Sequence, residues 1–414
     1  MSGGLRHAAN PEAVQILTEL LKRNIAILLV AQMVAITATI SLVTLGGIVG
    51  RLLAPSPALS TLPLSLFVVG TAMATVPAAW LMSSVGRARG FGCGAALGML
   101  GALVSMWAMA TESFPLFCLG GLLVGFSAAF SQQYRFAAAE SVAEPFAPQA
   151  VSVILLGSIV GAILGPEFAV RGESWVDGAP FAGTFMAIAA SYVLAGALLL
   201  LLRDAVAQTS APSTRDVRPL RFMVARWVFV VPVLGAAVGQ GVMVFVMTAA
   251  PLAMHVGDGH PLESAAAVVQ AHVLAMYIPS LFTGALIGRF GAVRVMLAGT
   301  AIFGVMVVVG FLGREVLHYG VSMVALGVGW NFLFIGGTTL LANAHQPAER
   351  FRAQAVNDFS VFGLSAMGSL SAGVVIQFFG WHAVLWASIP PVLVTMVVLV
   401  WARQVFSPAS TGPR

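Results

Sequence analysis

Long uncharged apolar runs limit the fold of this chain more than any other feature of its sequence. The first extends from residue 24 to residue 50 without a charged side chain. A helix needs about 20 consecutive apolar residues to cross a bilayer core, so each run is a candidate transmembrane helix. Division at charges, polar stretches and Pro/Gly clusters gives twelve segments: 24–50, 58–82, 91–110, 114–139, 148–170, 181–202, 225–251, 264–288, 292–312, 317–342, 356–379 and 382–402. The sequence therefore predicts an all-α membrane protein with twelve transmembrane helices.

Composition agrees with a membrane protein and argues against catalysis. Hydrophobic residues make up 59% of the 414 residues and charged residues 8%, outside the range of ordinary soluble domains. The sole lysine, Lys22, follows a leucine, so the chain has no G-K-[ST] phosphate loop. The sequences H-E-x-x-H, C-x-x-C and G-x-S-x-G are also absent. We therefore expect no enzyme activity, no cofactor and no bound metal.

Polar segments divide the chain into two halves. The longest lies between Arg203 and Arg221 and separates the twelve segments six and six. The predicted order is an N-terminal segment (1–23), a first six-helix bundle (24–202), a linker (203–224), a second bundle (225–402) and a tail (403–414). Within the first segment, Asn10 as N-cap, Pro11 and spaced leucines predict an interfacial helix that is retained rather than removed as a signal peptide.

Basic residues predict the orientation in the membrane. All but three of the 20 fall at one end of the predicted helices, together with both termini, and only Arg51, Arg171 and Arg314 lie at the other. The positive-inside rule then places both termini in the cytoplasm. The net charge of +5 follows from this topology, so no nucleic-acid partner is needed to explain it.

Three landmarks recur at nearly one offset between the halves. Gln32 matches Gln240, 208 positions later, each a lone amide in an apolar run. A ladder of small residues (Gly157, Gly161 and Gly165) matches Ser365, Ser369 and Gly373 at the same offset. The short loop 81–89 aligns with 286–294 at an offset of 205. Such repeats are typical of transporter folds that arose by duplication.

The two short loops resemble the G-x-L-x-D-R-x-G-R-R signature of the major facilitator superfamily (MFS). Gly288 stands where the second copy would carry its acid, and Ser83 and Ser84 replace Asp and Arg in the first. The resemblance implies the MFS fold of two pseudo-symmetric six-helix bundles and a cytoplasmic latch between them. The latch candidates are Gly86, Arg87, Arg89, Arg289, Gly291, Arg294 and Asp358. Asp358 either caps its helix or pairs with Arg87 or Arg89. Glu140 is the alternative partner for these arginines.

Two further stretches resemble motifs of this superfamily. The ladder that runs into Gly165-Pro166 is similar to its antiporter motif, although Ala169-Val170 replaces two glycines, and Gly121 stands where the fourth helix usually has arginine. Residues 329–334, followed by Pro347, Arg350 and Asn357, resemble a proteobacterial branch with members that move vitamin-like aromatic compounds such as riboflavin. The ladder has a packing interpretation as well, because small residues let helix backbones approach closely.

Charged groups at membrane depth are the sharpest candidates for function, since each is costly unless paired or hydrated. Glu167 is the candidate proton carrier; the alternative is an ion pair with Arg171 at i, i+4 spacing. Arg135, on one helix face with Gln132, would bind an anionic or polar substrate group, or else extend to the lipid headgroups. His255, Asp258 and His260 form a loop cluster that we interpret as solvated rather than metal-binding.

In the superfamily, helices one, four, seven and ten line the substrate cavity. Polar, sulfur-containing and aromatic side chains on these helices are the cavity candidates here, with ordinary helix packing as the alternative for each. They are Gln32, Thr39, Gln132, Arg135, Gln240, Met243, Trp330, Asn331 and Phe334. Together they favour a planar, partly apolar organic substrate.

The sequence thus predicts a monomeric secondary transporter of the bacterial inner membrane, moving a small organic solute by alternating access. Proton coupling and efflux are favoured by Glu167 and the antiporter-like motif. Uptake of a vitamin-like, aromatic nutrient is the alternative within transport. A non-transporting assembly factor or sensor on the same scaffold is the alternative of another class.

Overall fold

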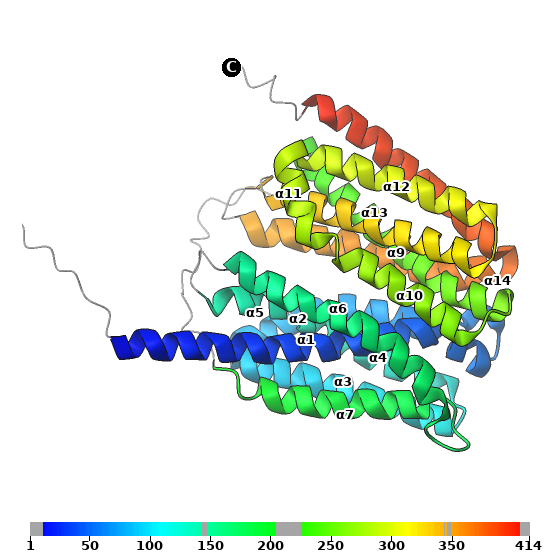
Figure 1. The fold of residues 1–414 in the computed structure, drawn as a ribbon, viewed down its shortest axis with the longest axis horizontal. Helices are drawn as coiled ribbons and strands as arrows, with labels where there is room; N and C mark the ends of the chain where they lie inside the picture. The colour runs from blue at the N-terminus through cyan, green and yellow to red at the C-terminus, as the bar shows by residue number, and fades with distance from the viewer. Residues whose placement is uncertain (1–10, 143–146, 204–224, 343, 346–348, 406–414) are drawn as a thin grey trace, which may run out of the picture.

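The computed structural model describes residues 11–142, 147–203, 225–342, 344–345 and 349–405, and every regular element in this part of the chain is helical (Figure 1). The helices are α1 (Pro11–Leu53), α2 (Leu62–Val85), α3 (Arg87–Ala110), α4 (Phe114–Ser131), α5 (Tyr134–Glu140), α6 (Ala147–Arg171), α7 (Ala182–Leu199), α9 (Trp227–Leu252), α10 (Leu262–Tyr277), α11 (Ser280–Phe290), α12 (Ala292–Leu312), α13 (Val316–Ala342) and α14 (Arg350–Val405). Short turns η1 (Pro57–Leu59), η3 (Gly172–Ser174) and η5 (Ala253–Gly257) follow α1, α6 and α9.

The helices account for the predicted membrane spans. Ten in the described part of the chain are long and apolar enough to cross a bilayer, and α10 with α11 forms one more span bent by 42°. The span Val356–Arg403 is 48 residues long and is interrupted at Gly380, where φ is 77°. Because a single crossing needs only about 20 residues, α14 comprises two spans, and the predicted total of twelve is reached.

The same packing pattern occurs in each half of the chain. Helix α1 packs against α6 as α9 packs against α14, and α3 packs against α4 and α7 as α12 packs against α13 and α14. Between the halves, α6 contacts α10 and, in the corresponding place, α2 contacts α14. Gly86 (φ 88°) and Gly291 (φ 83°), 205 residues apart, form the same tight link between two helices. The two halves are therefore structural repeats.

The start of α1 and the end of α14 lie at one end of the bundle, which we call the terminal end; the opposite end, with the α1–α2 and α12–α13 loops, is the distal end (Figure 1). Close contacts between the halves gather toward the distal end. Ser65 and Ser369 share a hydrogen bond of 3.0 Å, and Gly373 lies so close to α2 that a Cβ atom there would overlap Thr61. The distal end is thus packed closed in this conformation.

Two helices differ from the sequence prediction. The N-terminal segment continues directly into the first span: α1 begins at Pro11 and extends straight past the other helices toward the terminal end, rather than forming a separate interfacial helix (Figure 1). The predicted span 264–288 is broken at Ile278-Pro279. Proline lacks an N–H group and clashes with the preceding turn, which favours a bend at this point.

Candidate functional site

An aromatic and polar cluster lies where helices from both halves meet. Trp330 of α13 donates its indole N–H to Oε1 of Gln240 on α9. The Trp330 ring stacks on Phe334, with centroids 5.0 Å apart and planes 15° from parallel. Tyr277 of α10 approaches the same indole edge-on, at 6.4 Å. The cluster combines aromatic rings with hydrogen-bonding groups, which is the composition of sites for aromatic ligands.

Ser158 of α6 connects this cluster to the first half. Its hydroxyl accepts a 2.9 Å hydrogen bond from Nε2 of Gln32 on α1, and its side chain is also hydrogen-bonded to Tyr277. The two lone amides singled out by their repeat spacing, Gln32 and Gln240, therefore belong to one network. We call Gln32, Ser158, Gln240, Tyr277, Trp330 and Phe334 the central cluster. Because the bond between Ser158 and Tyr277 joins α6 of the first half to α10 of the second, relative movement of the halves must rearrange the cluster.

A pair of opposite charges lies beside the central cluster, again with one member in each half. Arg135 of α5 interacts electrostatically with Asp358 of α14 and with Tyr277. The Asp358 carboxylate accepts a 3.2 Å hydrogen bond from the side-chain amide of its neighbour Asn357. The Arg135 guanidinium also lies over the ring of Phe136, 4.9 Å from its centroid. An arginine in this position is turned inward, toward the second half, rather than only toward lipid headgroups.

The central cluster thus lies between two structural repeats, and comparison with known proteins identifies the family. The model of the Major Facilitator Superfamily matches residues 26–277 and 262–413. The chain belongs to the major facilitator superfamily.

Relatives similar over most of their length are named as transporters. The chain is 38% identical over 380 residues to the riboflavin transporter RfnT of Brucella anthropi, covering 92% of this chain and 95% of that protein. It is 28% identical over 399 residues to the uncharacterized MFS-type transporter YdeG of Bacillus subtilis, covering 93% of each. The MFS-type transporter YddS of the same organism is 27% identical over 376 residues, 86% of each. Family and names indicate transport across a membrane and not catalysis.

The remaining cavity candidates of this MFS protein lie elsewhere. Asn331 is fully buried and bonds to Met276 O, Ser280 Oγ and Thr283 Oγ1, so it satisfies polar groups at the α10–α11 bend. The remaining three do not enter the network of the central cluster. Thr39 donates to Ala35 O within α1, Met243 is buried in the packing of the second half, and Gln132 is exposed at the end of α4.

Ser158 and Tyr277 were not selected from the sequence, although each carries a signal. Tyr277 is one of only four tyrosines and directly precedes the Ile278-Pro279 break. Ser158 lies next to the first glycine of the ladder. A polar group beside a helix break or a small-residue seam often marks a binding region in transporters.

Glu167 forms an ion pair, and the glycine ladder forms a close helix contact, as the structural alternatives of the sequence analysis predicted. The Glu167 carboxylate lies 2.9 Å from Nε of Arg171, and both side chains are substantially exposed near the distal end. The ladder packs against α1: a Cβ atom on Gly161 would come within 2.6 Å of Ile36 Cβ, and one on Gly165 within 2.7 Å of Ile40 Cβ. Pro166 lies inside α6, which continues to Arg171.

The latch candidates lie at the terminal end, on both sides of the two glycine links. Arg87 donates to Glu140, with Nε and Oε2 2.7 Å apart. Of the two acids considered as its partner, Glu140 rather than Asp358 is the one observed. Arg89 is exposed, Arg289 lies over the Phe290 ring, and Arg294 reaches the Phe290 carbonyl at 3.4 Å. Asp358, considered as a partner of the loop arginines, lies instead near Arg135.

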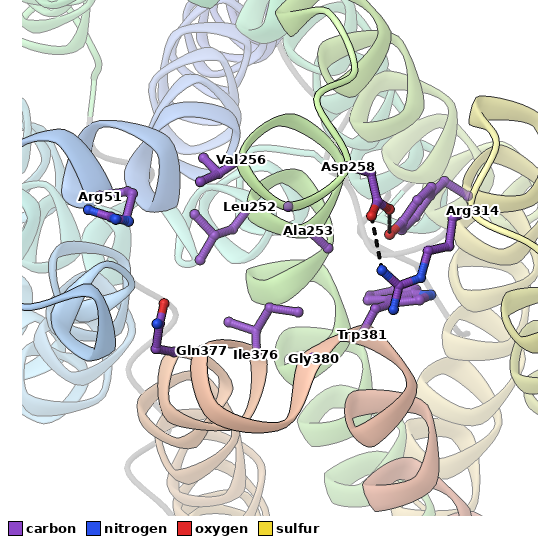
Figure 2. A pocket seen from close by; sticks show the side chains of 12 residues that line it. Arg51, Leu252, Ala253, Val256, Asp258, Arg314, Ile376, Gln377, Gly380 and Trp381 are labelled. Carbon is purple, nitrogen blue, oxygen red and sulfur yellow. Dashed lines mark hydrogen bonds and ion pairs between the residues drawn. The ribbon is translucent and has the colours of Figure 1, made fainter.

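A small cavity opens at the distal end (Figure 2). Its volume is about 130 Å³, and its lining includes Arg51 of the first half and Gln377 and Trp381 of the second. On one side Asp258 holds Arg314 at 3.1 Å and accepts a hydrogen bond from Tyr319. The cavity is far smaller than the usual pocket for a drug-sized ligand, about 300–1,000 Å³. Asp258 thus connects the α9–α10 loop to the α12–α13 loop. Among the described residues, no cluster of metal-binding side chains occurs.

Proposed function

We propose that this chain carries riboflavin, or a vitamin with a similar flat ring system, into the cell. The observation that supports this most is the full-length similarity to the riboflavin transporter RfnT. The comparison covers 92% of this chain and 95% of that protein. Uptake of an aromatic nutrient, the alternative in the sequence analysis, thereby becomes the preferred function.

The central cluster supports an aromatic substrate on independent grounds. Trp330 and Phe334 form a stacked pair whose flat surface suits a fused ring system, and offset stacking is worth about 0.5–1.5 kcal/mol for each ring pair. Gln32, Gln240 and Ser158 provide donors and acceptors at the same depth. A ligand that displaces the interaction between Ser158 and Tyr277 would release a contact between the halves and so promote the change of conformation.

The mechanism that we propose is alternating access by a monomer in the bacterial inner membrane, driven by protons. The terminal end, rich in arginine, faces the cytoplasm under the positive-inside rule. In this orientation the closed distal end faces outward. Glu167 remains the proton-carrier candidate from the sequence, although its exposed ion pair with Arg171 favours a structural role. Transport that keeps its pH dependence in Glu167→Gln would reject the carrier role.

The test is riboflavin movement in vesicles that contain the purified protein, under an imposed proton gradient of either sign. We expect riboflavin to accumulate inside vesicles with the orientation of the cell when the outside is acidic. Trp330→Ala should lower the transport rate about two- to tenfold, because ring stacking of this kind is worth about 0.5–1.5 kcal/mol. Trp107→Ala, at a tryptophan of α3 that is 65% exposed, is the matched control and should transport normally. Vesicles that move no riboflavin in either direction would refute the function.

Efflux is the second candidate, because the ladder that runs into Gly165-Pro166 is similar to the antiporter motif of the superfamily. The same vesicles decide between the two directions. An exporter would move riboflavin out of the vesicle interior in exchange for protons, whereas an importer accumulates it together with them.

A further inference from the structure

Two buried polar atoms beside the central cluster have no hydrogen-bond partner among the described residues. They are Nε of Arg135, a donor, and Oδ1 of Asn357, an acceptor. Asp358 relates the two side chains, since its carboxylate accepts from the Asn357 amide and interacts electrostatically with Arg135. One atom belongs to each half of the molecule. A donor and an acceptor therefore remain unused at the same interface.

Unpartnered groups of this kind are rare in folded proteins because each costs free energy that a hydrogen bond or water would recover. The polar side chains of the central cluster, by contrast, each make a hydrogen bond: Gln32 to Ser158, Ser158 also to Tyr277, and Trp330 to Gln240. Unused atoms next to a complete network are expected where a substrate supplies the missing partners.

Riboflavin carries complementary groups on one edge of its ring system. That edge is a pyrimidinedione, in which an imide N–H lies between two carbonyl groups. We infer that Arg135 and Asn357 recognise this edge: Arg135 Nε–H donates to a carbonyl oxygen, and Asn357 Oδ1 accepts the imide N–H. This inference rests on the proposed function and names the groups that determine its specificity. The substrate class is then planar heteroaromatic compounds with a free imide edge.

The position of the two residues fits such a ligand. Tyr277 interacts electrostatically with Arg135 and also packs edge-on against Trp330, so it connects the recognition groups to the stacked aromatic pair. A flat molecule with its rings on Trp330 and Phe334 would point one edge toward Arg135. Contacts to α5 and α14 at once would also engage both halves, as a transported substrate must.

The experiment measures binding of riboflavin and of N3-methylriboflavin to the purified full-length protein, by quenching of flavin fluorescence. The methyl group removes the imide N–H and leaves both carbonyl groups in place. Wild-type protein should bind riboflavin at least about tenfold more tightly, since a site built to hydrogen-bond a group discriminates against an analogue without it.

Variants separate the two contacts. Asn357→Ala should bind the two flavins within about twofold of each other, because the acceptor for the N–H is gone. Arg135→Lys should weaken both flavins alike and keep the preference, because the carbonyl that Arg135 contacts is present in both. Ser360→Ala is the matched control, since the Ser360 hydroxyl bonds to Val356 O within α14, and it should keep both affinity and preference.

Two results would overturn the inference alone while leaving riboflavin transport intact: equal binding of both flavins by wild type, or full discrimination by Asn357→Ala. The wild-type comparison decides even if Asn357→Ala does not fold. Failure of wild-type protein to bind riboflavin at all would instead overturn the proposed function, and the inference with it.

Discussion

At the scale of single residues, the two glycine links between helices give the clearest prediction. Gly291 has φ 83° and ψ 148°, a conformation that costs a residue with a side chain about 1–3 kcal/mol. Gly288, one turn earlier in α11, has the same open surroundings for a Cβ atom but no positive φ. Gly291→Ala should lower the thermal unfolding temperature of the detergent-solubilised protein, and Gly288→Ala should leave it equal or higher. Equal melting of the two variants would contradict backbone strain at this link.

The sequence located part of the candidate site through residue type alone. Gln32, Gln240, Trp330 and Phe334 were recognisable because amides and aromatic residues stand out on helices of the predicted cavity. Asn331 is equally conspicuous, yet it bonds to the α10–α11 bend instead. Neighbours on a helix point about 100° apart, so adjacent residues such as Trp330 and Asn331 face different partners, and only the packed structure assigns them.

At the scale of helices, the ladder in α6 predicts a sharp steric limit. A Cβ atom on Gly161 would lie 2.9 Å from the Thr37 backbone nitrogen as well as 2.6 Å from Ile36 Cβ, so a larger side chain must displace α1. Gly161→Leu should abolish riboflavin transport while the protein still reaches the membrane; overpacking costs about 1–3 kcal/mol and distorts the helix pair that carries Gln32 and Ser158. Uptake normalised to protein in the membrane tests this. Gly304→Leu is the control, because no atom lies within 4 Å of a Cβ there. Normal uptake by Gly161→Leu would contradict this steric limit on the contact between α1 and α6.

Helix existence was predictable from hydrophobicity, whereas helix breaks were not. Apolar runs of sufficient length yielded all twelve spans, because a bilayer leaves the backbone few alternatives to a helix. The bend at Pro279 was not predicted. Pro232 and Pro251 lie within α9 without ending it, so the presence of proline alone does not predict a break. At the break, Asn331 on a neighbouring helix donates to the Met276 carbonyl. Such a partner is set by tertiary packing and leaves no local pattern.

At the scale of the whole molecule, the repeat seen in the sequence agrees with the packing. Offsets of 205 to 208 residues relate both the glycine links and the lone amides, and the contacts of α6 with α10 and of α2 with α14 are equivalent. The domain boundaries at 202 and 225 remain predictions, since residues 204–224 lie outside the described part of the chain. The sequence did not predict which end is closed, because closure depends on contacts between the two halves and not on the sequence of either half alone.

Alternating access requires the closed distal end to open, and Ser65 with Ser369 offers a direct test. Their hydroxyl oxygens lie 3.0 Å apart across the halves, so cysteines at both positions are close enough for a disulfide with sulfurs about 2.05 Å apart. In a protein with Cys93→Ser and Cys118→Ser, the pair Ser65→Cys/Ser369→Cys should cross-link under oxidation and stop riboflavin transport, and reductant should restore it.

A protease site inserted between residues 204 and 224 reports the cross-link, since oxidised halves then stay joined on a non-reducing gel. Each single cysteine variant is the control and should transport normally under oxidant. The reason is thermodynamic: a covalent tie at the distal end excludes every state in which that end is open, and a carrier that binds substrate between its halves cannot complete its cycle without such a state. Undiminished transport by fully cross-linked protein would mean that substrate passes without separation of α2 from α14.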